Sequence, residues 1–564
     1  MRKIYYPKTF FTAIIFLLVA ITAFAQWPVS SDSNMIICDR FGDQCIPKIA
    51  AASDGGCYVS WFDHSSGNYD VYMQRLNGNG VIQWDSGGML ISNETQETWL
   101  TDYDMTVDGD DHAIVVFNDT RAGGDWDIYA YRISPNGDFI WGTSGLTLSD
   151  NVNFEANAVV TVTSSGNFVF AWQDEISVYL RKVDPQGTDM WSPHTINITS
   201  TYGTVKPRIV SAESDDVIVA VMQASGPNYW DPQHLYAHKF DSLGVEQWGS
   251  GGVAISTAGG IAPYMDYDLT SDGDGGAYSF WYDDRDMSLN AYVQHILSDG
   301  AMAWTANGVQ VSLAAGELQM YPSLVRFSSS SEVLVFYLAT DINQNLNGVH
   351  GQKLDSLGTR QWGSNGIVFV PMTNQTRSHI SAQPQPEGAV IVYKEYPPGS
   401  AIQSYIKATR VDMDGNQVWS TSPVDMCSNL SEKIRVPTTV NDSGMVIAAW
   451  DDGRLDPNGD IYLQNINADG SLGPPSGSSG CEYVVGDVNN SGAYNGLDIT
   501  YGVAFFKGGA APPYQCECTP GNFWYVAGDV NNSCSFNGLD ITYGVAYFKG
   551  GADPIPCDDC PPVE

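Results

Sequence analysis

Basic residues are scarce in this chain. Its 564 residues include 26 Lys and Arg against 64 Asp and Glu, which gives a formal net charge of −38. Nucleic acids and anionic membrane surfaces both attract basic patches, so the composition excludes both as expected partners. An acidic surface of this kind aids solubility and can gather divalent cations.

Long apolar runs are missing after the first 25 residues. The N-terminus itself has a basic start, an apolar run over residues 10–23, and small residues at Ala23 and Ala25 that fit a cleavage site. The run is short for a membrane span. We therefore expect a signal peptide at residues 1–25, a mature protein that is secreted or displayed at the cell surface, and no membrane span after signal removal.

Recognisable catalytic motifs are missing as well. The eight His residues show no His-Glu-x-x-His spacing, and no Gly-x-Ser-x-Gly elbow occurs. With 64 acidic residues, a carboxylate pair for glycoside cleavage could form in many places, so the sequence selects none. The catalytic residues are therefore unknown at this stage, and whether the chain is an enzyme stays open.

What the chain does have is a long repeat. Each unit contains a Gly, a few residues, a Trp and a short strand-like run, preceded by aromatic and β-branched runs with no helical period. The recurring residues are Trp84, Trp141, Trp191, Trp248, Trp304, Trp362 and Trp419. Four short strands in each of about eight units predict a mainly β fold, a β-propeller over residues 26–475. A β-solenoid is the competing repeat architecture.

The eighth unit is degraded in a way that suggests ring closure. Residues 470–473 keep the Gly-rich phrase, but the Trp and the strand after it are lost. A matching strand stands without a partner near the start of the chain, at residues 35–38. We expect this N-terminal strand to complete the last blade, because closure removes an exposed sheet edge.

Two kinds of loop residue are candidates for a role in the propeller. The pattern aromatic-x-Asp-x-Arg recurs in three units and ends at Arg121, Arg285 and Arg454. Its repetition favours a structural role, because an active site is normally found once. Trp126, Tyr229 and Trp230 occur in loops where they could stack on sugar rings, with ordinary packing as the alternative.

Ten Cys residues are unevenly placed, six of them in the last 84 residues. This density predicts a disulfide-stapled C-terminal module, with fifteen connectivities open. In the larger region, Cys38 and Cys45 are expected to form a short disulfide. Cys57 and Cys427 are expected to be buried thiols.

The repeat region resembles secreted bacterial proteins built from tandem units of the form DGxGGxxVxWxDxR…DIYxQRxxxxGxxxW. Segments such as residues 54–63 and 70–75 carry the likeness, which extends over residues 34–475. The resemblance implies a propeller and an extracellular setting. It implies no reaction, because such folds host unrelated functions.

Two near-identical segments 42 residues apart follow a linker at residues 476–480, within a module at residues 481–564. Each places oxygen-bearing groups at positions 1, 3, 5, 7, 9 and 12, the spacing by which EF-hand-type loops bind calcium. We therefore expect two calcium ions. The expected ligands are Asp487, Asn489, Ser491, the Ala493 carbonyl, Asn495 and Asp498 in the first loop, and Asp529, Asn531, Ser533, the Ser535 carbonyl, Asn537 and Asp540 in the second.

This small α-helical module resembles a type I dockerin, with Asp at position 12 and Asp-Val-Asn opening each loop. The resemblance implies docking to a cohesin-like partner. Position 5 is Ser where the family has Asp, which leaves two carboxylates in each loop. Positions 10 and 11 are Gly496-Leu497 and Gly538-Leu539, small and apolar where the family carries hydroxyl groups.

Three functions fit these observations. The first is a secreted or surface-associated binding, adhesion or scaffold protein, in which the propeller presents ligand-binding loops and the module docks to a partner protein through calcium. The second is an extracellular polysaccharide-degrading enzyme, a glycoside hydrolase or lyase, with carbohydrate as its substrate. The third is a structural protein with a calcium-stabilised tail.

Overall fold

The structure is a computed structural model that describes residues 26–564 except 95–101, 122, 456, 476–482, 520–521, 558–559, 561 and 563–564. The expected signal peptide and the expected linker at 476–480 lie outside the described residues. Within the described ranges, neither helix has the length and hydropathy needed to cross a membrane.

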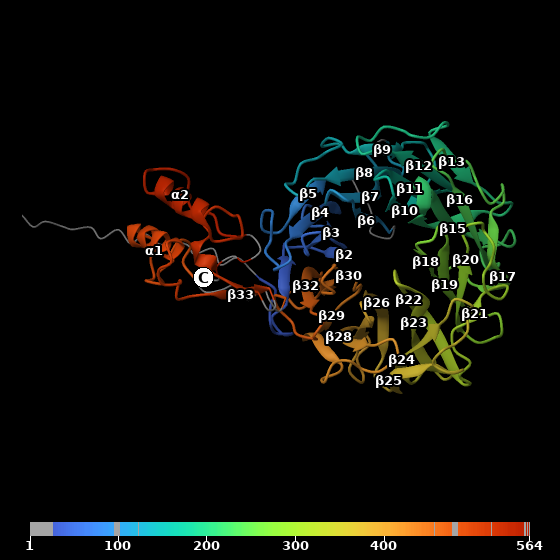
Figure 1. The fold of residues 1–564 in the computed structure, drawn as a ribbon. Helices are drawn as coiled ribbons and strands as arrows, with labels where there is room; N and C mark the ends of the chain where they lie inside the picture. Colours follow the sequence, from blue (N-terminus) through green and yellow to red (C-terminus); the bar gives the residue numbers. More distant parts are fainter. Residues whose placement is uncertain are drawn as a thin grey trace, which may run out of the picture.

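The described residues form eight four-stranded antiparallel sheets arranged in a ring, so the predicted eight-bladed β-propeller is confirmed (Figure 1). The innermost strands are β2 (Gln44–Ala51), β6 (Asp104–Val107), β10 (Glu155–Val162), β14 (Thr204–Ser211), β18 (Tyr267–Ser271), β22 (Glu317–Phe327), β26 (Arg377–Gln385) and β30 (Thr438–Val440). The second strands are β3 (Cys57–Asp63), β7 (Ala113–Asp119), β11 (Phe168–Asp174), β15 (Val217–Ala224), β19 (Ala277–Asp283), β23 (Ser330–Asp341), β27 (Gly388–Glu395) and β31 (Val446–Asp452).

The outer half of each blade completes the sheet. The third strands are β4 (Asp70–Leu76), β8 (Asp127–Ile133), β12 (Ser177–Val183), β16 (Gln233–Phe240), β20 (Asn290–Ile296), β24 (Asn347–Leu354), β28 (Gln403–Val411) and β32 (Asp460–Ile466). The outer strands are β5 (Met89–Ser92), β9 (Leu146–Ser149), β13 (Thr195–Ile198), β17 (Val253–Ile261), β21 (Val309–Gln310), β25 (Ile367–Thr373), β29 (Val424–Glu432) and β1 (Met35–Cys38).

The N-terminal strand closes the ring as expected. β1 pairs antiparallel with β32, with Met35 opposite Leu463, so blade 8 has the order β1-β32-β31-β30. The first and last segments of the ring therefore lie side by side in one sheet (Figure 1).

The recurring Trp residues link consecutive blades. Each indole N–H donates to a carbonyl in a turn of the following blade, as from Trp84 to Pro135 at 3.0 Å. The Trp that the eighth unit lacks is supplied by Trp27, which donates to Gly78 at 3.0 Å. Its ring packs on Gly80, where an added Cβ would lie 2.7–2.8 Å from Trp27. Trp27 thus completes the eighth link from the opposite end of the repeat region.

The aromatic-x-Asp-x-Arg pattern forms a second link between blades. The buried Asp283 accepts from the guanidinium of Arg285, whose Nη2 also reaches Ser256 Oγ at 3.3 Å in the preceding blade. Blade 2 repeats this with Arg121, and in blade 8 Arg454 donates to the Cys427 thiol at 3.1 Å. The predicted structural role is therefore the one this geometry supports.

One expectation about cysteine is wrong. Cys38 and Cys45 form no disulfide, and both are buried free thiols together with Cys57 and Cys427. Cys38 lies on the outer strand of blade 8, whereas Cys45 lies on the innermost strand of blade 1, so pairing into different blades keeps them apart. The two residues expected to be buried thiols are confirmed as such.

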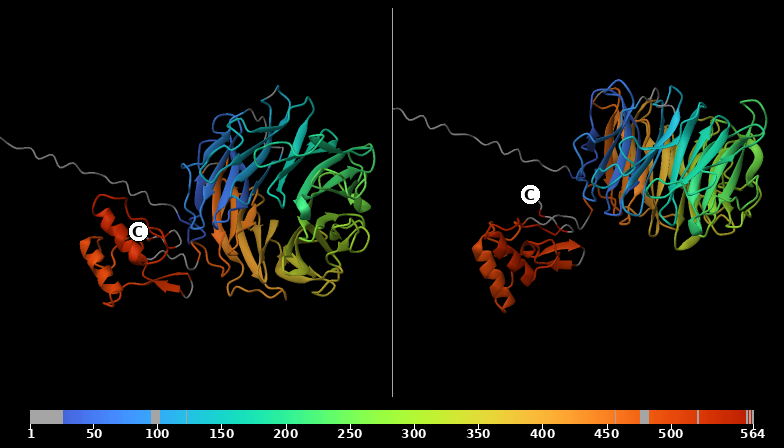
Figure 2. Two further views of the ribbon diagram at one scale, coloured as in Figure 1. Left: turned by 45° about the horizontal axis from the view of Figure 1, so that its top comes forward. Right: turned by 90° about the horizontal axis from the view of Figure 1, so that it is seen from above.

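The C-terminal module contains the only α-helices of the described residues, α1 (Gly496–Phe506) and α2 (Gly538–Tyr547), outside the ring (Figure 2). A short hairpin, β33 (Cys516–Thr519) and β34 (Asn522–Trp524), lies between them in sequence. The helices cross at two glycines, since a Cβ on Gly502 would lie 2.4 Å from Ile541 and one on Gly544 would lie 2.5 Å from Ile499. Close backbone approach thus fixes how the two repeats pack.

Candidate functional site

The first expected calcium loop brings its oxygen atoms together. Asp487 Oδ1 accepts from the Ser491 backbone N–H at 2.8 Å and lies 3.3 Å from Ser491 Oγ. Ser491 Oγ lies 3.4 Å from the Ala493 carbonyl, and Asp498 accepts from the Asn489 N–H at 3.2 Å. Asn489 Oδ1 is buried without a hydrogen-bond partner among the described residues. Such an atom needs a donor or a cation.

The second loop has nearly the same geometry. Asp529 Oδ1 accepts from the N–H groups of Asn531 and Ser533, both at 3.2 Å. Ser533 Oγ donates to the Ser535 carbonyl at 3.1 Å. Burial, together with the neighbouring Asp529 carboxylate, raises the pKa of Asp540 to about 6. Facing carboxylates in a turn fit a hard cation such as calcium.

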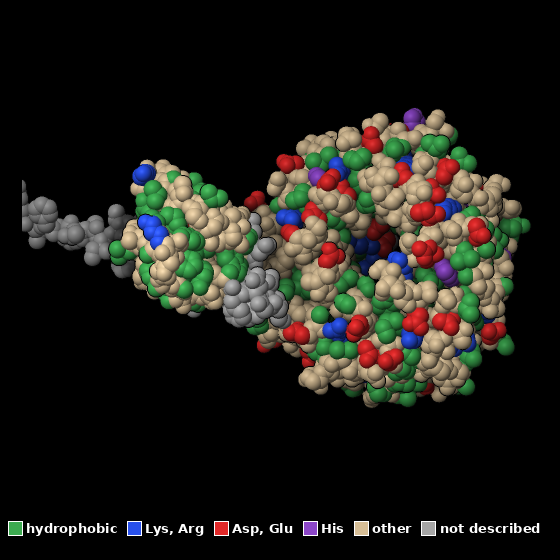
Figure 3. All heavy atoms as spheres, viewed as in Figure 1, with side chains coloured by type: hydrophobic (Ala, Val, Ile, Leu, Met, Phe, Trp, Pro, Cys, Tyr) green, Lys and Arg blue, Asp and Glu red, His purple; other side chains and the backbone are tan. Residues whose placement is uncertain are grey.

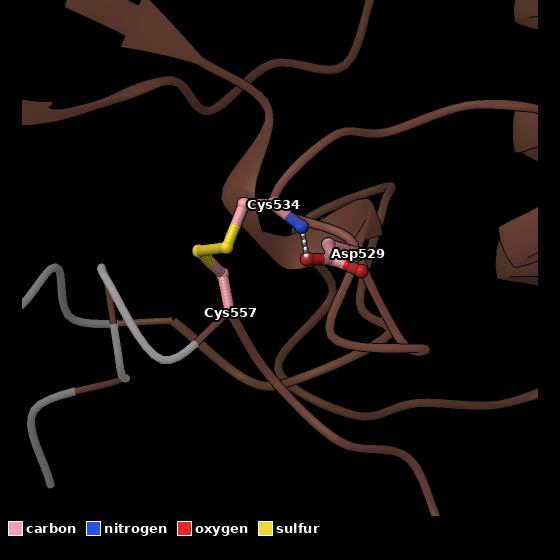
Figure 4. Close-up of side chains that lie close together, drawn as sticks. All are labelled: Asp529, Cys534 and Cys557. Atoms are coloured by element: carbon pink, nitrogen blue, oxygen red, sulfur yellow. Dashed lines mark hydrogen bonds between the residues drawn. A yellow bond between two sulfur atoms is a disulfide. The ribbon is translucent and has the colours of Figure 1, made fainter. Parts of the chain in front are cut away.

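Cys534 occupies the sharp turn of the second loop, where the first has Gly492. Its φ is 52°, a left-handed conformation that glycine adopts more easily. Figure 4 shows the Cys534 N–H donating to Asp529, at 2.8 Å, and the disulfide from Cys534 to Cys557. Sulfur atoms joined in a disulfide are not thiolates and therefore do not act as metal ligands. Any ion in this loop would be bound by oxygen atoms.

Position 9 serves as a helix cap in both loops. The side-chain carbonyls of Asn495 and Asn537 accept from the N–H groups of Leu497 and Leu539, at 2.9 and 2.8 Å. In EF-hand loops this position often reaches the ion through water, which is compatible with the capping bond. The residues of both loops therefore fit a calcium ion each.

The central channel holds a second constellation that the sequence did not reveal. One position at the start of the innermost strands carries a different residue in almost every blade, and we call these eight residues the mouth ring. They are Ile46, Asp102, Asn157, Lys206, Asp266, Tyr321, His379 and Arg435. Seven of them line two adjoining cavities of about 580 and 490 Å³, a size suited to a small ligand or to part of a larger one.

The backbone at the mouth ring is strained. Ile46, Asn157, Lys206, Tyr321 and His379 all have φ between 50° and 54°, and the pairing register of each strand shifts there. Such β-bulges re-aim a side chain, and left-handed non-glycine residues tend to occur at functional sites. In four of these five blades the distorted residue lines the channel cavities. Ile46 is the exception, because its side chain is buried in the hydrophobic core of the blade.

Opposite charges meet inside the channel. Asp102 pairs with Lys48 at 2.9 Å and with Arg435 at 3.1 Å, while Lys206 pairs with Asp266 at 2.9 Å. Figure 3 shows basic and acidic side chains gathered in the hollow at the centre of the disc. Burial opposes ionisation of Asp102, but Lys48 and Arg435 outweigh it and lower the pKa of Asp102 to about 2.

Two other carboxyl groups on the innermost strands have raised pKa values, in contrast to Asp102. Asp104 and Asp268 lie two residues beyond Asp102 and Asp266 on the same innermost strands. Desolvation by the surrounding protein raises the pKa of each, although the Asp268 side chain is 58% exposed, and the nearby cations Lys48 and Arg208 only partly counter it. Carboxyl groups whose pKa values are driven apart are the usual acid and base pairs of enzymes.

His379, Tyr321 and Arg435 line the same cavity. His379 is exposed, but desolvation by the protein around it, with Lys394 and Arg435 nearby, lowers its pKa to about 4, so its imidazole is neutral at neutral pH. A neutral imidazole can accept a proton, and a guanidinium can hold an anion or a developing negative charge. These groups give the cavity both acid-base and electrostatic chemistry.

Exposed aromatic rings lie on the same face of the propeller as this opening. We call the side of the propeller where innermost strands begin and second strands end the mouth face, as where Gln44 pairs with Asp63. Every exposed aromatic side chain of the described propeller lies in a segment at this face. They are Phe41, Phe154, Tyr202, Tyr229, Trp230, Tyr264 and Tyr321. Aromatic faces at an opening provide stacking surfaces for sugar rings.

The stacking candidates from the sequence divide into two cases. Tyr229 and Trp230 are 81% and 77% exposed, so they are free to meet a ligand. Trp126 is half-buried and packs on Phe154 with ring centroids 5.2 Å apart. Packing is therefore the main role of Trp126.

Neither a protein-family model nor a curated protein matches the chain. Among solved structures, an ulvan lyase of polysaccharide lyase family PL25 matches at 10% identity, over 67% of this chain and 96% of that one, with a TM-score of 0.41. An α-L-arabinanase from Penicillium chrysogenum matches at 10% identity, over 55% and 92%, with a TM-score of 0.29. A protein of unknown function from Dyadobacter fermentans matches at 12% identity, over 67% and 97%, with a TM-score of 0.36.

Proposed function

We propose that this protein is an extracellular polysaccharide-degrading enzyme whose active site is the mouth of the propeller channel. The observation that carries the proposal is the coincidence of two features on one face. Exposed aromatic rings lie on the same face as an opening whose lining breaks the repeat and carries acid, base and cationic groups. This arrangement favours the enzyme over the adhesion or scaffold protein that the sequence first suggested.

The residues support specific roles. His379, neutral at neutral pH, acts as the proton acceptor. Arg435 holds an acidic group of the substrate or the charge that develops during the reaction, while Asp102 keeps that guanidinium in place at 3.1 Å. Tyr321, beside them in the cavity, supplies a phenol and a stacking surface.

A panel of neutral and acidic polysaccharides incubated with the full chain tests this proposal. We expect cleavage of one class of substrate, and the His379→Ala variant should lose about 10²–10⁴-fold in kcat, the usual contribution of a positioned base. Products with an unsaturated end, detected by ultraviolet absorbance, indicate elimination, whereas saturated reducing ends indicate hydrolysis.

The matched control is His194→Ala, because His194 is exposed and lies outside the channel lining. It should keep wild-type activity. If His379→Ala cleaves the substrate at the wild-type rate, the channel mouth is not the active site. If the wild type binds a glycan at the mouth face without cleaving any, the binding function is the correct one.

For the C-terminal module we propose calcium-dependent docking to a cohesin-like or other surface protein. The support is the convergence of oxygen atoms in both loops and the exposure of Leu497 and Leu539, each 69% exposed at equivalent positions. These leucines offer a partner two apolar contacts related by the internal repeat.

Capture of extracellular proteins by the immobilised full chain tests the docking role. A specific partner should be retained with calcium and released by a chelator, and the Leu497→Lys/Leu539→Lys variant should fail to retain it. A partner retained equally by this variant contradicts docking through these helices. If calcium raises the melting temperature but nothing is retained, the module is only a stabilised tail.

A further inference from the structure

Blade 2 holds a pair of carboxylates that lacks donors. Asp127, the first residue of β8, is 0% exposed, and neither of its carboxylate oxygens has a hydrogen-bond partner among the described residues. Asp125 Oδ2, two residues earlier, is buried and unpartnered as well. Buried carboxylate oxygens are almost always paired, because leaving them unpaired is costly. Three such atoms in one short segment need a common explanation.

Blade 1 shows one way in which an aspartate at this position is satisfied. Asp70 and Asp127 are equivalent, since each begins the third strand and lies opposite the Asp that ends the second. In blade 1, Asn68 Nδ2 donates to Asp70 Oδ1 at 2.8 Å. Blade 2 has Asp125 where blade 1 has Asn68, so a donor is replaced by a group that only accepts when ionised.

The surroundings of the pair are negative. No Lys, Arg or His in the described part of the chain forms an ion pair with Asp125 or Asp127. Arg121 is committed to Asp119, at 2.6 Å, and to other acceptors. Burial and the carboxylates of Asp125, Asp150 and Asp119 raise the pKa of Asp127 to about 6. The local field therefore attracts a small, hard cation.

We propose that Asp125 and Asp127 bind a calcium ion at the mouth face of blade 2. Their unpartnered oxygens supply the protein's charged ligands, and water molecules complete the six to eight oxygens that calcium takes. Trp126, between them in sequence, packs on Phe154 of blade 3 and so anchors the segment to the next blade. The site is separate from the two loops of the C-terminal module, and it does not depend on the enzymatic proposal.

The Asp125→Asn variant tests the site with the full chain. This substitution restores the amide that blade 1 uses, so the fold should be kept while a charged ligand is lost. In equilibrium dialysis against calcium with elemental analysis, the variant should bind one equivalent less than the wild type. It should also be more heat-stable than the wild type in the presence of a chelator.

Two further variants complete the design. Asp85→Asn removes the same charge at an exposed position and should bind as much calcium as the wild type. Asn68→Asp creates the blade 2 pair in blade 1 and should add one equivalent. Equal calcium content in wild type and Asp125→Asn overturns the proposal. So does a wild type whose melting temperature ignores calcium but falls as the pH rises through about 6, because a shared proton then satisfies the pair.

Discussion

Glu155 differs from the equivalent glutamate of another blade in having no basic partner among the described residues. It begins β10, is 0% exposed, and accepts from Ser149 Oγ at 2.5 Å and Asn151 Nδ2 at 2.6 Å, while its Oε2 has no partner among the described residues. The equivalent Glu317 in blade 6 pairs with His350 at 2.8 Å. Burial in the absence of a cation, with Asp174 nearby, raises the pKa of Glu155 to about 7.

This shift predicts a pH effect on stability. Because the folded-state pKa lies above the ordinary value of 4.5, the folded protein holds the extra proton between about pH 4.5 and 7. The free energy of unfolding therefore falls as the pH rises through that window. Glu155→Gln mimics the protonated acid, so it should be more stable than wild type above pH 7, by at most about 3 kcal/mol.

Chemical denaturation at pH 5 and pH 8 measures this difference. The advantage of Glu155→Gln should be small at pH 5 and grow toward pH 8. A difference that is the same at both pH values means that Glu155 is ionised in the folded protein throughout. Glu175→Gln, a neighbouring acidic residue with a more exposed side chain, serves as the control.

At the scale of elements, the bulges of the innermost strands interrupt the regular strand pairing and change the direction in which a side chain points. Tyr321 sits in such a bulge with φ of 50° and a side chain that is 49% exposed. A left-handed tyrosine costs about 1 kcal/mol or more. Because such strain tends to be kept at functional sites, it indicates that the direction of the Tyr321 side chain serves binding.

Tyr321→Gly should therefore weaken glycan binding without destabilising the fold. Glycine relieves the backbone strain but increases the entropy of the unfolded chain by a similar amount, so the melting temperature should change little. The KM for the substrate, or the Kd in a binding assay, should rise. A variant with unchanged affinity would show that the bulge at this blade has no role in recognition.

Repetition in the sequence made both the blades and the calcium loops predictable. The Trp period and the strand without a partner at residues 35–38 were enough for the eight blades and the closure, because both repeat or complete a pattern. The calcium loops could be located because their oxygen-bearing residues occur twice in the same spacing. Their occupancy by calcium stays a prediction.

The residues of the channel could not be predicted as a site from the sequence, for a physical reason. Lys206, Tyr321 and His379 share no residue type, and each lies tens of residues from the next, so only the ring brings them together. Aligning the eight units would have shown a position with no consensus, which is the available signal. Trp27 was missed because it precedes the first repeat, and the disulfide of Cys38 with Cys45 was wrong because sequence proximity ignores blade membership.

At the scale of the whole molecule, the ring depends on its N-terminal segment. Trp27 is 1% exposed, and its indole fills the eighth link between blades. Trp27→Ala should lower the free energy of unfolding of the propeller by about 3–5 kcal/mol, the usual cost of removing a buried Trp. Trp230→Ala, at an exposed position, should leave the stability unchanged. Thermal denaturation of both variants checks this, and equal melting temperatures would contradict the role of Trp27.

The pairing of β1 with β32 also sets an order of events. β1 is synthesised more than 400 residues before its partner β32, so the ring can close only when synthesis of the blades has finished. Before β1 docks, β32 presents an open edge, and either the molecule's own β1 or the β1 strand of a second molecule can pair with it. During refolding at high concentration, strand exchange between molecules is therefore the misfolding expected of this architecture. Dilution should suppress it, because closure within one molecule does not depend on concentration.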